Sequence, residues 1–292
     1  MPTLAIILVV FSALMHGVRD TLTKSSDDKQ IFMWLFILAE LIIALPAFLY
    51  FGLRDAQITQ TIVLLLITAG CIHTTYAFLL SKTLQHGDLS HVYPIIRSAP
   101  VLITIIAVTA LAEQVSTQAI AGIALVICGA YMINMKRWSL RAALEPLMSI
   151  PTEHPTQLAI LTMFAVTAYS LFDKQMMMHI HPVTYVFLID VFIFCVFTPY
   201  IFLRKTRKAI NSEWDKNKWA IWFNGAIALV GYIFILYAYT MAKVSYVTGL
   251  RQISIVFAVL LGGHVLKEKN KAIRLTAGII ICIGSALIAL AE

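Results

Sequence analysis

Apolar stretches of about twenty residues alternate with short polar breaks along almost the whole chain. A stretch of this length spans a bilayer as a helix, so each one predicts a transmembrane helix. The pattern predicts ten of them, at residues 3–23, 31–51, 58–80, 90–111, 116–135, 157–178, 183–203, 219–241, 245–266 and 272–291. Only 136–156 and 204–218 are long enough to be predicted as loops. Because no soluble domain fits between the helices, function must reside in the helices and their ends.

The composition agrees with a chain that lies mostly in lipid. Of its 292 residues, 60% are hydrophobic and 13% are charged, which is about half the charged fraction of a soluble protein. These values exclude a water-soluble enzyme, an extracellular disulfide scaffold and a disordered chain. The four cysteines lie in four different apolar stretches without metal-ligand spacing. We therefore expect neither a metal nor a cofactor.

Basic residues are concentrated on one side of the predicted membrane. Of 22 Lys and Arg residues, sixteen lie in the connections after the first, third, fifth, seventh and ninth helices, and two (Arg54 and Lys243) lie in the connections on the other side. Such a bias marks the cytoplasmic face, so it predicts both termini outside. The net charge of +7 thus orients the protein and does not indicate nucleic-acid binding. We expect a multi-pass protein of the bacterial inner membrane.

The chain also repeats itself. Four matches occur in the same order at offsets of 153 to 156 residues: Phe11–Asp20 with Phe164–Asp173, Ser90–Pro94 with Ser245–Gly249, Glu113 with Glu268, and Ala121–Ile123 with Ala277–Ile279. We interpret residues 1–135 and 157–292 as two five-helix copies joined by 136–156. Because five is odd, the second copy enters the membrane from the opposite side. This inverted repeat is the build of many secondary transporters, although duplication for structural bulk alone is the plainer alternative.

Two copies of five helices, a Ser-x-Val-x-Pro start to the fourth helix (Ser90–Pro94) and Glu113 after that helix resemble the drug/metabolite transporter superfamily. The EamA-type members are the most similar, and the resemblance covers essentially the whole chain. It implies an all-α membrane protein with ten helices around a central cavity, lined mainly by the first, third, fourth, sixth, eighth and ninth helices. The chain departs from the family at His16-Gly17 and Tyr169-Ser170, where members carry Trp-Gly or a similar pair. The resemblance also implies cytoplasmic termini, against the charge bias.

Polar side chains recur at mid-depth in six predicted helices. A charge at the bilayer centre costs about 2.5–3.5 kcal/mol on insertion scales, so these residues require a function or a partner. Helical spacing gathers them on shared faces. The candidate substrate-binding residues are His16 and Arg19, His73 and Tyr76, Tyr93 and Arg97, Tyr169, Tyr232, and Arg251 and Gln252. They lie on the six helices that the resemblance assigns to the cavity.

Arg97 and Arg251 carry the substrate prediction. Arginine keeps its charge in any plausible environment, and its fork fits a carboxylate or a phosphate. Two arginines facing a hydrated site predict an anionic or zwitterionic metabolite, such as an amino acid or an organic anion. Structural ion pairs are the alternative, and they would join Arg97 to Glu40 or Asp190, and Arg19 to Asp20 or Asp173.

Four residues are candidates for proton coupling. His16 and His73 carry imidazoles, which titrate near neutrality. Asp20 and Asp173 are the repeat-related carboxylates, and desolvation favours their protonated form. Either a proton or a counter-substrate is therefore an expected partner, beside the small-molecule substrate and membrane lipid.

Proline, glycine and glutamate positions predict moving parts. Pro94 and Pro100 interrupt backbone hydrogen bonding in the fourth helix and indicate a hinge or a static kink, and Gly249 takes the place of Pro94 in the second copy. Glu113 and Glu268 end their helices, where a capping or gating role is favoured over substrate contact. Glycines in the fifth and tenth helices predict close helix contacts. Whether the protein is a monomer or a homodimer stays open.

These features together predict a secondary-active or facilitative transporter that moves a small polar metabolite by alternating access. A flippase for a lipid or a lipid-linked headgroup is the alternative, with Arg19 and Lys24 near the headgroups. An enzyme is disfavoured because zinc-protease, nucleophile-elbow and P-loop motifs are absent from the sequence. Transport would therefore run on a gradient or by exchange.

Overall fold

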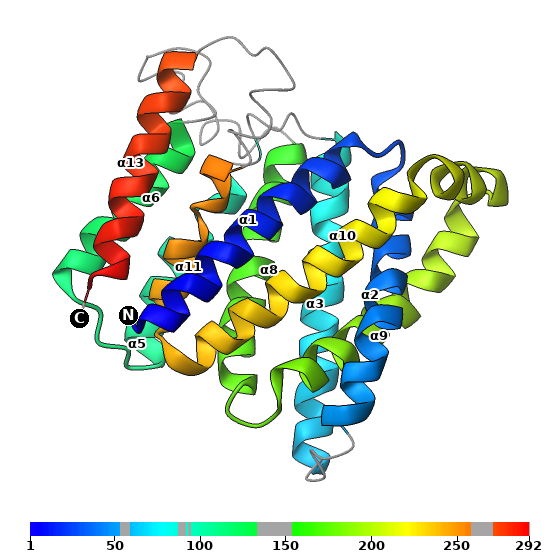
Figure 1. The fold of residues 1–292 in the computed structure, drawn as a ribbon, viewed down its shortest axis with the longest axis horizontal. Helices are drawn as coiled ribbons and strands as arrows, with labels where there is room; N and C mark the ends of the chain where they lie inside the picture. Colours follow the sequence, from blue (N-terminus) through cyan, green and yellow to red (C-terminus); the bar gives the residue numbers. More distant parts are fainter. Residues whose placement is uncertain (53–58, 87–91, 93–94, 133–153, 258–270, 292) are drawn as a thin grey trace.

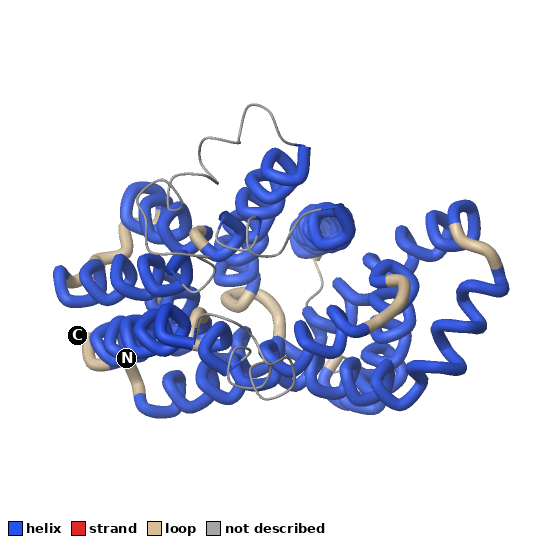
Figure 2. The backbone as a smooth tube through the Cα atoms, turned by 90° about the horizontal axis from the view of Figure 1, so that it is seen from above, coloured by secondary structure: helices blue, strands red, loops and turns tan. Residues whose placement is uncertain are grey.

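The computed structural model describes residues 1–52, 59–86, 92, 95–132, 154–257 and 271–291. Within these residues the regular structure is entirely helical (Figure 2). The helices are α1 (Thr3–Ser25), α2 (Lys29–Phe51), α3 (Gln60–His86), α5 (Ala99–Ala110), α6 (Thr117–Met132), α8 (His154–Met176), α9 (Pro182–Arg204), α10 (Arg207–Met241), α11 (Val244–Arg251) and α13 (Lys271–Ala289). By length and composition α2, α3, α8, α9 and α10 are able to cross a membrane, and α1, α5, α6 and α13 contain shorter apolar stretches.

One predicted connection is largely helical. Residues 204–218 were expected to form a loop, but α10 begins at Arg207, where the Thr206 hydroxyl accepts a hydrogen bond from the Ala209 amide at 3.2 Å. Low hydropathy hid this segment, although one of its faces packs on the protein through buried Glu213. The 35 residues of α10 extend over about 52 Å at 1.5 Å per residue. Its first turns therefore project beyond a hydrocarbon core of about 30 Å.

The helices pair in a reciprocal pattern. In order along the two predicted copies, α1, α2, α3, α5 and α6 correspond to α8, α9, α10, α11 and α13. The packing of α1 on α10 is matched by that of α8 on α3, and the packing of α2 on α10 by that of α9 on α3. In addition α2 packs on α9, α5 on α11 and α6 on α13 (Figure 1). Two copies related by a two-fold axis produce this arrangement.

Glycine allows α6 and α13 to approach closely. A Cβ atom added to Gly122 would lie 2.7 Å from the carbonyl oxygen of Gly284, and one added to Gly284 would lie 2.6 Å from that of Gly122. Gly129 faces the carbonyl oxygen of Ala277 in the same way, at 2.8 Å. The expected close contacts therefore join the two copies within one chain, as small residues do in membrane helix pairs.

The helix that leads into α5 breaks at Ser98. The Ser98 amide bonds the carbonyl oxygen of Ile95 at 3.2 Å, three residues back instead of four. Pro100 follows in the first turn of α5, where an amide is not needed for helical bonding. The proline thus lies at the start of a new helical segment.

The corresponding helix of the second copy breaks after α11. The Gln252 amide bonds the carbonyl oxygen of Gly249 at 3.2 Å, and the Ile253 amide bonds that of Leu250 at 3.1 Å. Both bonds again reach back only three residues. Because Ser98 and Ile253 are 155 residues apart, both copies break at the same level, and α5 packs on α11 there.

The two ends of the chain meet. The terminal amine of Met1 donates to the carbonyl oxygens of Ala289 and Ala291, at 3.2 and 3.0 Å, and Figure 1 shows both termini at the same end of the molecule. An even number of membrane crossings has this consequence.

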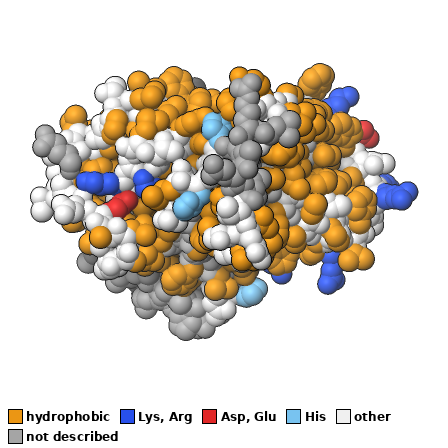
Figure 3. Space-filling model, turned by 90° about the horizontal axis from the view of Figure 1, so that it is seen from below, with side chains coloured by type: hydrophobic (Ala, Val, Ile, Leu, Met, Phe, Trp, Pro, Cys, Tyr) orange, Lys and Arg blue, Asp and Glu red, His pale blue; other side chains and the backbone are white. Residues whose placement is uncertain are grey.

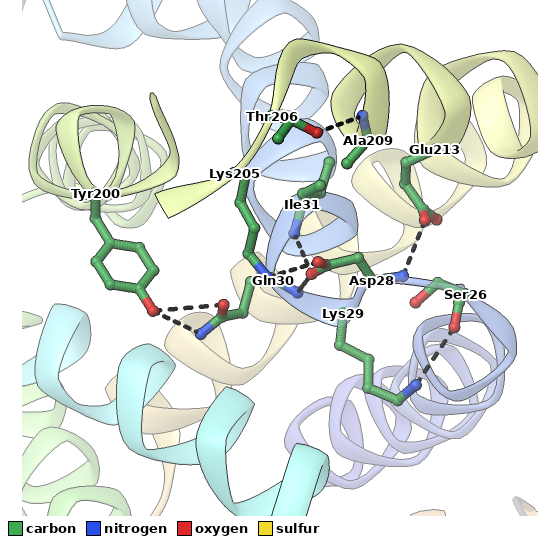
Figure 4. A network of polar contacts seen from close by, with 10 residues as sticks. All are labelled: Ser26, Asp28, Lys29, Gln30, Ile31, Tyr200, Lys205, Thr206, Ala209 and Glu213. Carbon is green, nitrogen blue, oxygen red and sulfur yellow. Dashed lines mark hydrogen bonds and ion pairs between the residues drawn. The ribbon is translucent and has the colours of Figure 1, made fainter. Parts of the chain in front are cut away.

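A polar network ties the turn between α1 and α2 to the turn between α9 and α10 (Figure 4). The Asp28 carboxylate accepts from the Gln30 and Ile31 amides, which caps α2, and it pairs with Lys205 Nζ at 2.5 Å. The Asp28 amide in turn donates to Glu213 of α10 at 3.0 Å. The turn between α1 and α2 is therefore fixed by contacts with the start of α2, with Lys205 and with Glu213.

A second ion pair beside this network is exposed to solvent. Lys216 Nζ lies 2.5 Å from the Asp27 carboxylate, and through this hydrogen bond and its charge it holds the pKa of Asp27 below the ordinary value. Exposed pairs of this kind contribute little to stability.

The outer surface is strongly apolar. Leu203, Leu290 and Trp219 are 83%, 73% and 79% exposed. Figure 3 shows hydrophobic side chains over most of the visible face, with Lys and Arg toward its edges. Exposed apolar area of this extent marks a surface that another apolar phase covers, and here lipid is that phase.

Gly122→Ala should destabilise the α6–α13 contact, because its new methyl group would meet backbone atoms that have little freedom to move. We expect a free energy of unfolding about 1–3 kcal/mol lower than that of Gly278→Ala, measured by thermal melting in detergent. Gly278 is the matched control, since the nearest atom to its added Cβ is Val256 Cγ1 at 4.0 Å. Equal melting temperatures would contradict the close contact.

Asp28→Ala should lower the free energy of unfolding by about 1–2 kcal/mol, since it removes a helix cap and an ion-pair partner. Lys216→Ala, which breaks only the exposed pair, should stay within about 0.5 kcal/mol of the unaltered protein. Melting both variants at low and high salt provides the comparison, and an equal loss in the two would refute the distinction.

Candidate functional site

A buried carboxylate joins four helices at the centre of the molecule. Asp173 of α8 is 0% exposed. Its Oδ1 atom lies within hydrogen-bond distance of His73 Nε2 of α3, at 2.9 Å, and accepts a hydrogen bond from the Tyr185 hydroxyl of α9 at 2.6 Å. Its Oδ2 atom accepts from the Tyr232 hydroxyl of α10. Each carboxylate oxygen therefore has at least one partner, as a buried charge requires.

Aromatic rings pack around this carboxylate. The ring centroid of Tyr169 lies 4.8 Å from that of His73 and also 4.8 Å from that of Tyr76. The Tyr232 hydroxyl lies 3.3 Å from His73 Nε2 as well. We call Asp173, His73, Tyr185 and Tyr232 the carboxylate cluster. The structure thus brings together His73, Tyr76, Tyr169, Asp173 and Tyr232, all of them singled out in the sequence.

A small cavity adjoins the carboxylate cluster. It leaves about 20 Å³ for the centre of a water-sized sphere, which is room for about one water molecule and far less than the roughly 300–1,000 Å³ of most ligand pockets. Its lining comes from α1, α10 and α11 and consists of Ser12, His16, Arg19, Ile227, Ala228, Gly231, Tyr232 and Arg251. Tyr232 belongs to both features, so a single side chain connects the cavity to Asp173.

Basic side chains line the cavity. Arg19 and Arg251 both line it, and Arg19 Nη2 lies 3.3 Å from His16 Nε2. Arg251 Nε is buried and makes no hydrogen bond to the described residues. Two guanidinium groups and an imidazole at one cavity are a set of donors that suits a carboxylate or phosphate oxygen.

Two further predicted binding residues, Arg97 and Gln252, lie at the helix breaks. Arg97 is absent from the described lining of this cavity, and its Nη1 atom donates to Ser254 Oγ at 3.4 Å. That contact joins the two broken helices of the two copies. Gln252 follows Arg251 directly, is 7% exposed, and its Oε1 atom makes no hydrogen bond within the described part of the chain.

Glu113 of the first copy forms hydrogen bonds with the start of α11 in the second copy. Its Oε1 accepts from the Val244 amide at 2.7 Å, and its Oε2 accepts from the Ser245 hydroxyl at 2.7 Å. The carboxylate therefore caps the N-terminus of α11, where the helix dipole also favours a negative charge. Gly249 of the same helix packs against α6 and α13, since an added Cβ would lie 2.9 Å from Ile288 Cδ1 and 3.1 Å from Ile123 Cγ1.

Some candidates lie outside the described residues. Tyr93, Pro94 and Glu268 are among them, and for Asp20 only the helical backbone is described.

Two residues of the site were missed in the sequence. Tyr185 is the third partner of Asp173, yet no helical spacing relates it to a polar neighbour on α9. Ser12 lines the cavity, and here a signal was present, because Ser12, His16 and Arg19 follow the i, i+4, i+7 spacing of a single helix face.

Comparison with known proteins agrees with this architecture. A model of the EamA-like transporter family matches residues 3–135 and 156–290. One similar solved structure, described only as "Crystal structure of protein", has a TM-score of 0.75 and 14% sequence identity, over 98% of this chain and 96% of that chain. At this identity the likeness shows the fold alone. No curated protein matches the sequence.

Glu113→Ala should destabilise the start of α11, because the Val244 amide and the Ser245 hydroxyl lose their acceptor. A loss of about 1–2 kcal/mol is the expected size for a helix cap, measured by thermal melting. Gln114→Ala is the control, since Lys243 bonds only the main-chain oxygen of Gln114. If both variants melt alike, Glu113 does not stabilise the fold.

Proposed function

This chain belongs to the EamA-like transporter family, and from that premise we propose that it carries a small anionic or zwitterionic metabolite across the membrane by alternating access. The chain is a multi-pass integral membrane protein and a membrane transporter. The proposal concerns its substrate, its binding residues and its mechanism. An amino acid or a small organic anion has the required charge, and the cavity would have to widen to admit it.

The observation that carries this proposal is that Arg19 and Arg251 line the same cavity. Arg251 keeps a buried Nε donor without a hydrogen bond to the described residues, and a carboxylate oxygen of the substrate supplies the acceptor. His16 and Tyr232 add hydrogen-bonding groups to the same wall. A zwitterion also meets the phenol oxygen of Tyr232, which accepts a hydrogen bond from an ammonium group.

The helix breaks support alternating access. Transporters built from repeats place their sites at discontinuous helices near the bilayer midplane. Both breaks of this chain lie where α5 and α11 pack, and Arg251 is the last residue of α11. Exchange of conformation between the two copies would open the cavity first to one side and then to the other. Arg97 stays a candidate for substrate contact on the sequence argument.

The orientation follows from the distribution of charge. The Asp28 network belongs to the basic side, which the positive-inside bias places in the cytoplasm, and the termini lie at the other end. We propose the bacterial inner membrane as the location. The sequence has no P-loop, and we propose that transport runs on a gradient, that of the substrate included, or by exchange.

A thermal-shift screen on the purified protein in detergent tests the substrate class. The panel holds L-glutamate, L-alanine, succinate, pyruvate, inorganic phosphate, spermidine and phosphatidylglycerol. We expect at least one soluble anion or zwitterion to raise the melting temperature, since binding to the folded state stabilises it, and spermidine to have no effect. Stabilisation by phosphatidylglycerol alone would favour a lipid flippase, and stabilisation by spermidine alone would refute an anion site.

Arg251→Gln should weaken binding of the stabilising compound about tenfold or more, because a charge-assisted hydrogen bond is worth about 1.5–3 kcal/mol. Arg204→Gln, on the exposed end of α9, is the matched control and should bind like the unaltered protein. Uptake of the same radiolabelled compound into liposomes then shows whether binding leads to transport. Unchanged affinity in Arg251→Gln would overturn the assignment of the cavity.

A further inference from the structure

We infer that Asp173 and His73 together form the proton-binding site of this transporter, and that Tyr232 transmits their protonation state to the cavity. The inference rests on the proposed function, since it takes the cavity as the substrate site. The geometry that carries it is the Tyr232 side chain, whose hydroxyl bonds Asp173 while the same residue lines the cavity.

The carboxylate cluster has a defined set of titratable neighbours. They are His73 and Tyr76 of α3, Tyr185 of α9, Tyr232 and Tyr239 of α10, Arg251 of α11, His16 and Arg19 of α1, and Tyr169 and Lys174 of α8 itself, and a second buried carboxyl group, Asp190, lies further along α9. Helix α5, which also packs on α8, contributes no titratable side chain. Within the described residues, the side chains that directly contact the Asp173 carboxyl group are His73, Tyr185 and Tyr232.

Lys174 does not compete for that carboxylate. Its Nζ donates to the main-chain oxygens of Tyr239 and Ala242, at 2.5 and 3.0 Å, and so caps the C-terminus of α10. His73 is therefore the basic group that directly contacts Asp173 in the described structure, at 2.9 Å. A proton taken up from water belongs to this pair as a unit, because groups in such close contact titrate together.

Protonation changes the hydrogen bonds that the cluster is able to make. An ionised Asp173 is an acceptor only, so it accepts from His73, Tyr185 and Tyr232 at once. A protonated carboxyl group has an O–H donor, which a neutral His73 is able to accept, and its bond with the Tyr232 hydroxyl loses the strength that a charged acceptor gives it. If His73 takes the proton instead, its contact with Asp173 becomes an ion pair, and the imidazolium competes for the carboxylate with the Tyr232 hydroxyl, which lies 3.3 Å from its Nε2 atom.

Tyr232 is the hydrogen-bond partner of Asp173 whose side chain borders the cavity. Tyr185 is fully buried on α9, whereas Tyr232 lines the cavity. Its released hydroxyl then faces the substrate position between Arg19 and Arg251. Uptake of a proton by the pair and binding of a substrate by the cavity are thereby linked through one hydroxyl group.

The first experiment counts protons in the protein without substrate. Purified protein in phosphatidylcholine liposomes is taken from about pH 8 to about pH 5, the range in which histidine pairs titrate, and proton uptake is measured. The double variant His73→Gln/Asp173→Asn should bind about one proton fewer per chain than the unaltered protein. Asp215→Asn, an exposed carboxylate of α10, is the control and should bind the same number. Equal uptake by the double variant and the unaltered protein would overturn the proton site.

The second experiment tests the link through Tyr232. Cys71, Cys128, Cys195 and Cys282 are replaced by alanine, and Ser12→Cys then places one thiol in the cavity wall. Its rate of labelling by a methanethiosulfonate reagent is followed over the same pH range and divided by the rate in the double variant, which corrects for ionisation of the thiol. We expect this ratio to change with pH, and Tyr232→Phe to abolish the change while proton uptake stays.

Each outcome of the second experiment has a distinct meaning. A ratio that is independent of pH, or one that Tyr232→Phe leaves unaltered, overturns the link. All variants are first compared by thermal melting, so that a folding defect is recognised. Because neither experiment uses a substrate, a failure here is separate from a failure of the ligand screen with Arg251→Gln.

Discussion

The need to satisfy a charged group buried within the membrane governs the centre of this protein. A carboxyl group within a membrane-spanning helix is costly, and Asp173 is tolerated because His73, Tyr185 and Tyr232 surround it. These partners come from α3, α9 and α10, so the charge fixes the positions of three helices around α8. Removal of any one partner would leave part of a buried charge without compensation. Such a cluster therefore specifies an arrangement of helices, and it is the place where we propose that a proton binds.

The broken helices are subject to a related constraint, because backbone polar groups within the membrane also need hydrogen-bond partners. Non-helical backbone at membrane depth is tolerated where it is buried in protein or faces a water-filled cavity. Ser98 and Gln252 lie at such breaks, one in each copy, and the contact of Arg97 with Ser254 joins them. The cavity lies next to the second break through Arg251. Polar side chains and freed backbone groups are thus concentrated at one level, where the two copies meet.

The helices pack tightly away from the breaks and the cavity, so a change of conformation is easiest at the level of the breaks. Gly122 and Gly284 hold α6 and α13 at backbone contact, and Asp28 holds the turns at the opposite end of the molecule from the chain termini. Glu113 ties the end of α5 to the start of α11. These contacts join the copies at their edges, while the middle contains a cavity and polar groups. A transporter that rocks one copy against the other requires this distribution.

The sequence by itself determined the number, approximate bounds and duplicated order of the helices, because hydropathy over about twenty residues depends on local composition alone. It also marked His73, Tyr169, Asp173 and Tyr232, since a polar residue in an apolar helix is conspicuous without any structure. It hid the first turns of α10, whose charge resembles that of a loop while one of their faces packs on the protein. Only the tertiary structure decided that Tyr185 and Ser12 belong to the site, that Arg19 accompanies Arg251 at the cavity, and that Arg97 contacts Ser254. Which side chains meet across helices depends on the rotation and crossing of those helices, and these are set by contacts between residues far apart in the sequence.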